Sequence, residues 1–141
     1  MRVFKLKKNI KVSVLIANYN NQNFIGKCIQ SLKKQTYKNI EIIFHDDASN
    51  DNSIKVASKF KNIKIIRNKN RGKHGSLNQL YAYERAFKKS RGKIIFFLDS
   101  DDFFINTKIE RVINIFKSKK NINVIYDLPI YKYKKKKIIK E

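Results

Sequence analysis

The chain has 141 residues, of which 33 are basic and 11 acidic, giving a formal net charge of +22. This length suits a single domain with its own core, and 42% hydrophobic with 12% aromatic residues excludes a chain that is disordered throughout. A single cysteine, Cys28, excludes an intramolecular disulfide and a cysteine-based zinc site.

Apolar runs and amphipathic segments alternate along the chain. Short apolar runs predict buried strands, and apolar residues three and four positions apart predict helices. In chain order these are a strand over residues 11–17, a helix over 24–35, a strand over 40–44, a helix over 51–60, a strand over 63–66, a helix over 76–90, a strand over 94–98, a helix over 107–116 and a strand over 122–126. This alternation predicts an α/β fold with a mostly parallel sheet and helices on both faces.

Two features of the predicted helices concern individual side chains. Cys28 shares an apolar helical stripe with four other residues, which predicts a core thiol rather than a nucleophile; the others are Phe24, Ile25, Ile29 and Leu32. Ser76 with Gln79, and Thr107 with Glu110, have the spacing of capping boxes at the starts of two helices.

Six of the 11 acidic residues gather in two clusters, each following a predicted strand: Asp46, Asp47, Asp51, Asp99, Asp101 and Asp102. Because residues 94–98 are all large and apolar, their strand is expected to be buried on both faces. The second cluster then lies at a strand's carboxyl end, where open α/β sheets bind ligands. The bland alternative is a solvated acidic turn that caps the next helix.

An Asp-x-Asp pattern also carries a chemical expectation. Carboxylates this close together raise each other's pKa unless a cation lies among them. Hard oxygen ligands suit Mg²⁺ or Mn²⁺, which would also hold the phosphates of a substrate. Asp46 and Asp51 are expected to be structural, as a cap or lysine partner and as a helix N-terminal acid, respectively.

Short sequence blocks occur in a characteristic order: residues 12–20 (VSVLIANYN), 28–32 (CIQSL), 35–37 (QTY), 41–43 (EII), 46–51 (DDASND), 70–72 (NRG) and 91–102 (RGKIIFFLDSDD). As an ordered set covering roughly residues 11–118, they resemble the nucleotide-binding half of a family 2 glycosyltransferase. The resemblance implies the GT-A (Rossmann-like) fold. In the block DDASND, Ala48 stands where the family has glycine.

The resemblance also implies a function, which is transfer of a sugar from a nucleotide-diphosphate donor to a saccharide or lipid-linked acceptor, with Mn²⁺ or Mg²⁺ as cofactor. The implied positions are Ala17 and Tyr19 around the base, Asp47 bonding it, Asp101 as the direct metal ligand, Asp99 near the ribose or metal, and Asp102 near the sugar. Arg71 or Lys73 could add a phosphate contact.

The sequence departs from the family at three further places. Tyr83 and Glu84 stand where the family tends to have Arg-Asn. His45 replaces an apolar residue and is expected to be a hydrogen-bonded structural histidine. The chain stops soon after Asp127, before the segment that supplies the catalytic base and the acceptor half in the family. We therefore expect a shortened domain that transfers sugar poorly alone, with Asp127 as its single candidate base.

This organisation divides the chain into a basic lead-in over residues 1–10, a domain over 11–127 and a basic tail over 128–141. One alternative is a non-catalytic nucleotide-sugar-binding module. Another, resting on the net charge, is a nucleic-acid or membrane-surface binder. Carboxylates at the ligand edge would repel nucleic acid, which argues against nucleic-acid binding.

The lysines of the tail predict either peripheral contact with an anionic membrane or a solvated basic end. No apolar run approaches the ~20 residues of a membrane-spanning helix. Lysines also interrupt the N-terminus, where a signal peptide would need an apolar core. The sequence therefore predicts a cytoplasmic protein and leaves open whether its tail contacts a membrane or is a solvated end.

Overall fold

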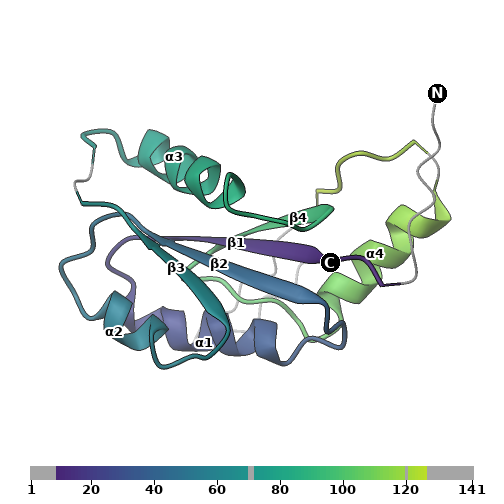
Figure 1. The fold of residues 1–141 in the computed structure, drawn as a ribbon, viewed down its shortest axis with the longest axis horizontal. Helices are drawn as coiled ribbons and strands as arrows, with labels where there is room; N and C mark the ends of the chain where they lie inside the picture. Colours follow the sequence, from purple (N-terminus) through teal and green to yellow (C-terminus); the bar gives the residue numbers. More distant parts are fainter. Residues whose placement is uncertain (1–8, 70–71, 120, 127–141) are drawn as a thin grey trace, which may run out of the picture.

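A computed structural model of the chain describes residues 9–69, 72–119 and 121–126. In this part, four parallel strands form one sheet in the order β3-β2-β1-β4 (Figure 1). The strands are β1 (Val12–Asn18), β2 (Ile40–Asp46), β3 (Ile63–Arg67) and β4 (Ile94–Asp99). Because they all run the same way, their carboxyl ends meet at one edge of the sheet.

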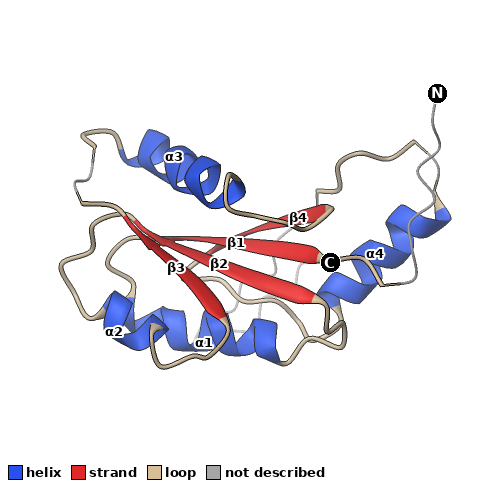
Figure 2. Cartoon of the chain, in the orientation of Figure 1, coloured by secondary structure: helices blue, strands red, loops and turns tan. Residues whose placement is uncertain are grey.

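Four helices cover the two faces of this sheet: α1 (Gln22–Lys33), α2 (Ser53–Ala57), α3 (Gly75–Phe87) and α4 (Lys108–Ser118). Figure 2 shows α1, α2 and α4 on one face and α3 on the other. The predicted α/β architecture, with a parallel sheet and helices on both faces, is therefore confirmed. In the described residues, no helix is long and apolar enough to cross a membrane.

The core is unequal on the two faces. The larger cluster packs β1, β2 and β4 against α1 and α4, with Val14, Ile29 and Ile113 among its fully enclosed members. The smaller cluster lies under α3, where Leu15 and Ile43 meet Ala86. Every residue of β1 is buried because it is a central strand with helices on both sides.

The expectation that the strand at residues 94–98 is buried on both faces is wrong. Phe97 is 60% exposed, whereas Phe96 and Leu98 are buried in the larger cluster. Within the described part of the chain, β4 is an edge strand that pairs only with β1. One face of β4 packs on the larger cluster, and its other face is incompletely covered at this edge of the sheet. Phe97 instead contacts Tyr83 of α3 edge-to-face, with ring centroids 5.0 Å apart.

The predicted strand over residues 122–126 is also wrong. These residues form no ladder with any of the four strands, and Val124 and Tyr126 are largely exposed. An extended apolar segment becomes a strand only when a neighbour accepts its backbone hydrogen bonds.

Some details of the predicted helices also need correction. Neither capping box forms: His74 is the N-cap of α3, and Thr107 is the N-cap of α4 without a side-chain cap bond. Glu110 instead accepts a hydrogen bond from the Thr36 hydroxyl at 2.8 Å, a tertiary contact that outcompetes the local one. The α2 helix spans only five residues, and Phe24 is 51% exposed although Cys28 is buried as predicted.

Candidate functional site

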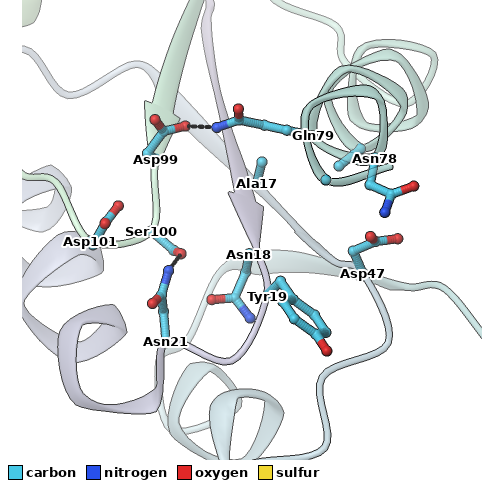
Figure 3. Close-up of a pocket in the computed structure, with 12 residues that line it drawn as sticks. Ala17, Asn18, Tyr19, Asn21, Asp47, Asn78, Gln79, Asp99, Ser100 and Asp101 are labelled. Carbon is cyan, nitrogen blue, oxygen red and sulfur yellow. Dashed lines mark hydrogen bonds between the residues drawn. The ribbon is translucent and has the colours of Figure 1, made fainter. Parts of the chain in front are cut away.

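A cleft of about 290 Å³ opens at the carboxyl edge of the sheet (Figure 3). Five of the predicted site residues line it, namely Ala17, Tyr19, Asp47, Asp99 and Asp101. The sheet register brings them together, since Ala17 pairs with Asp99 and its neighbour Asn18 pairs with Asp46. Asp102 lies just outside this lining, on the exposed side of the turn.

Asp46 organises the turn at the end of β2. It is fully buried, and its Oδ1 accepts hydrogen bonds from Asn18 Nδ2 at 2.7 Å and Ser49 Oγ at 2.6 Å. Its Oδ2 accepts the Ser49 N–H at 3.0 Å. Asp46 is thus structural, but it fixes the turn through Ser49 and caps no helix. No lysine in the described residues forms an ion pair with it.

Asp51 has the predicted role of a helix N-terminal acid, and it serves two helices at once. Its Oδ2 accepts the Gln22 N–H at the start of α1, and its Oδ1 accepts the Ser53 N–H at the start of α2. Burial raises the pKa of Asp51, but these hydrogen bonds outweigh burial and hold it below its ordinary value. Through the hydrogen bond from Gln22, Asp51 links the loop after β1 to the turn after β2.

Asp47 is placed in the cleft by backbone and side-chain contacts. Its N–H donates to the Asn18 carbonyl oxygen at 2.9 Å, and its Oδ1 accepts from Asn68 Nδ2 at 2.9 Å. Asn68 is itself fixed, because its N–H donates to the Asp46 carbonyl oxygen at 2.8 Å. Figure 3 shows Asp47 and Asp101 at opposite sides of the cleft, with Ala17 and Asn18 between them.

Ala48, next to Asp47, adopts a left-handed backbone conformation with φ of 60°. For a residue with a Cβ this conformation costs roughly 1–2 kcal/mol, which glycine avoids. Glycine also gains freedom in the unfolded chain, which offsets about 0.4–1 kcal/mol. We therefore expect Ala48→Gly to stabilise the protein by about 0.5–1 kcal/mol in urea unfolding.

The matched control for this prediction is Ala57→Gly, which removes the same methyl group from a buried helical position. That change should destabilise the protein. If both substitutions destabilise it alike, the turn after Asp47 carries no backbone strain.

The Asp-x-Asp turn is held between β1 and α3. Asp99, the last residue of β4, accepts hydrogen bonds at Oδ1 from Gln79 Nε2 at 2.6 Å and from the Tyr83 hydroxyl. The Ser100 N–H donates to the Ala17 carbonyl oxygen at 3.2 Å, and Asn21 Nδ2 donates to Ser100 Oγ at 2.7 Å. The first carboxylate is therefore anchored, while Asp101 projects into the cleft as an exposed side chain.

The electrostatics of this turn favour a cation. Partial burial, followed by the charges of Asp101 and Asp99, raises the pKa of Asp102 above its ordinary value. The same carboxylates act on Cys28, whose Sγ lies 3.7 Å from the Asp99 carbonyl oxygen. Burial, with their charges, raises the pKa of Cys28 to about 12, so the thiol stays protonated and is no nucleophile.

His45 is wholly buried in β2, but it is not hydrogen-bonded as expected. Neither ring nitrogen has a hydrogen-bond partner within the described residues. Burial, followed by the charge of Arg85, lowers the pKa of His45, so the imidazole is neutral. It is a core residue and lies outside the cleft lining.

The carboxylates of the cleft fit a divalent ion only together with oxygens from a bound substrate. In the part of the chain that the structure describes, no three carboxylate, histidine or cysteine side chains form a ready-made metal site. Mg²⁺ is commonly held by one or two carboxylates together with substrate phosphates. Asp101 and Asp99 fit an ion of this kind, provided that a bound substrate supplies the remaining oxygens.

Several residues that line the cleft were not predicted as site residues from the sequence: Asn18, Asn21, Asn78, Gln79 and Ser100. The i, i+4 spacing of Gln79 and Tyr83 on a predicted helix was the available signal, because it puts both on one helical face. Lys73 does not line the cleft. Arg71, Asp127 and the basic tail lie outside the described residues, as does most of the lead-in.

The fold and cleft define an α/β domain with an open cleft at the carboxyl ends of its parallel strands. The profile of glycosyl transferase family 2 matches residues 13–141, and the chain belongs to this family. The resemblance found in the sequence is confirmed.

The chain is also similar to individual members of the family. It is 40% identical over 109 residues to an Escherichia coli protein named UDP-Glc:alpha-D-GlcNAc-diphosphoundecaprenol beta-1,3-glucosyltransferase WfaP, across 77% of this chain and 42% of the relative. The chain therefore spans less than half the length of that relative.

Two solved structures share the fold. S. aureus TarS 1-349 in complex with UDP matches with a TM-score of 0.69 and 23% identity, over 77% of this chain and 32% of the TarS 1-349 chain. The mannosyltransferase PcManGT from Pyrobaculum calidifontis, in complex with GDP-Man and Mn²⁺, matches with a TM-score of 0.56 and 18% identity, over 68% and 29% of the two chains. The predicted GT-A fold is confirmed, and the described residues make up part of it.

Proposed function

We propose that the cleft binds a nucleotide-sugar donor and that the chain acts in sugar transfer to a lipid-linked saccharide acceptor. The observation that carries this proposal is the meeting of Asp47 with Asp99 and Asp101 in one cleft at the strand ends. The name of the E. coli relative, a UDP-glucose-dependent transferase with a diphosphoundecaprenol-linked acceptor, supports the choice of both substrates.

The base of the nucleotide would lie at the Asp47 side of the cleft. The Asp47 carboxylate, oriented by Asn68, is a suitable acceptor for the N–H of a uracil ring. Tyr19 is half-buried beside it and offers an aromatic face for stacking, while Ala17 is small enough to leave room for the ring. These contacts would select a flat base that carries an N–H donor.

The diphosphate would lie at the other side, where Asp101 and Asp99 would hold Mn²⁺ or Mg²⁺ against its oxygens. When bound, the ion neutralises charge on the departing nucleoside diphosphate and so assists its departure. Asp102, next to the cleft on the same turn, would face the sugar. The role of Asp127 as a base for the acceptor hydroxyl stays a prediction, as does membrane contact through the basic tail.

The proposal is tested by calorimetry with UDP-glucose in the presence of Mn²⁺ and again in EDTA. We expect binding with Mn²⁺ that weakens by at least about tenfold in EDTA, because the diphosphate and the carboxylates then repel each other without a cation. Equal binding under the two conditions would remove the metal from the proposal. Absence of binding both with Mn²⁺ and in EDTA would overturn the donor site.

A further inference from the structure

Two side chains of α3 converge on one carboxylate oxygen of the Asp-x-Asp turn. Gln79 and Tyr83 are one helical turn apart, and both donate hydrogen bonds to Asp99 Oδ1. The helix that carries them is itself fixed, because Ala82 and Ala86 are buried against the sheet. Figure 3 shows Gln79 reaching from α3 to Asp99.

The ring of Tyr83 is also fixed by a contact with the sheet. It packs edge-to-face on Phe97, which lies two residues before Asp99 on β4, with an interplanar angle of 78°. Its hydroxyl group donates to Asp99 Oδ1 and serves as an uncharged donor.

We propose that Tyr83, together with Gln79, is a positioning residue that fixes the Asp99 carboxylate for the metal–diphosphate end of the cleft. This inference rests on the proposed function and adds to it a support on α3. Without these donors, the Asp99 side chain would rotate away from the nearby carboxylates of Asp101 and Asp102. Because a phenol and an amide carry no charge, they orient Asp99 and leave its negative charge available to a cation.

The expected effect is that of losing an outer contact to a metal-binding carboxylate, a loss that typically weakens metal affinity by about 10–100-fold. Tyr83→Phe removes the hydroxyl and keeps the ring that packs on Phe97. We expect it to weaken Mn²⁺-dependent UDP binding by about tenfold in calorimetry. Binding of uridine without metal, which depends on the Asp47 side of the cleft, should stay unchanged.

The matched control is Tyr81→Phe, which removes a hydroxyl from an exposed tyrosine of the same helix. It should leave both UDP and uridine binding at the level of the unchanged protein. Gln79→Leu provides a second variant, in case Tyr83→Phe lowers the melting temperature more than Tyr81→Phe does. It removes the other donor from a more exposed position, and it should weaken UDP binding in the same metal-dependent way.

The outcomes separate this inference from the proposed function. Unchanged Mn²⁺-dependent UDP binding in both Tyr83→Phe and Gln79→Leu would overturn the positioning role and leave the donor site standing. An equal loss of uridine binding would reduce Tyr83 to a general structural residue and also overturn it. If the unchanged protein shows no Mn²⁺-dependent binding, the proposed function fails and this inference fails with it.

Discussion

Replacing Asp101 with alanine is expected to abolish the Mn²⁺-dependent part of UDP-glucose binding, so that the affinity with Mn²⁺ falls to the value in EDTA. Asp101 is exposed in the cleft, and no side chain of the described residues donates a hydrogen bond to its carboxylate. The substitution should therefore remove a ligand without disturbing the fold. Isothermal calorimetry measures the loss, and thermal unfolding checks that the melting temperature is retained.

Two comparisons make this result specific. Glu84→Ala removes an exposed carboxylate from α3, where it pairs with Lys88, and should leave the Mn²⁺ dependence unchanged. Asp47→Ala should weaken binding with and without metal alike, because Asp47 would contact the base rather than the diphosphate. Mn²⁺ dependence that persists in Asp101→Ala would show that another group holds the ion.

The alternation of apolar runs was enough to predict the four strands and their parallel arrangement. It failed where burial depends on neighbours that are distant in sequence. Phe97 belongs to a continuous apolar run, yet it is exposed because β4 lies at the sheet edge. An apolar side chain indicates that a residue can be buried. The order of the strands decides whether a neighbouring element covers that side chain.

The candidate site was predictable where it follows from topology. Parallel strands end at one edge, so the acid clusters after β2 and β4 had to come close together. What supports those acids was not predictable in the same way. Gln79 fitted a local capping box, but its partner is Asp99, which lies 20 positions further along the chain. A local pattern cannot outweigh a tertiary contact that appears only after the helix docks.

Replacing Gly92 with alanine is expected to destabilise the protein by about 3 kcal/mol, combining overpacking with the loss of a partly buried hydrogen bond. A Cβ at Gly92 would lie 2.7 Å from the Val12 carbonyl carbon and closer still to the backbone nitrogen and Oγ of Ser13. Both neighbours belong to β1, the buried central strand, so the backbone cannot give way easily. The Gly92 N–H also donates to Ser13 Oγ at 2.8 Å, a bond that would be pushed apart.

This change should also reach the cleft, because β4 begins just after Gly92 and ends at Asp99. Urea unfolding measures the stability, and Mn²⁺-dependent UDP binding reports on the displaced strand end. The matched control is Gly26→Ala in α1, where the nearest atom to a Cβ is Val56 Cγ1 at 4.0 Å, an ordinary contact. Since alanine favours a helix over glycine by about 1 kcal/mol, this variant should be more stable than the unchanged protein. Equal stability of the two variants would mean that β1 and the start of β4 do not approach as closely as the structure places them.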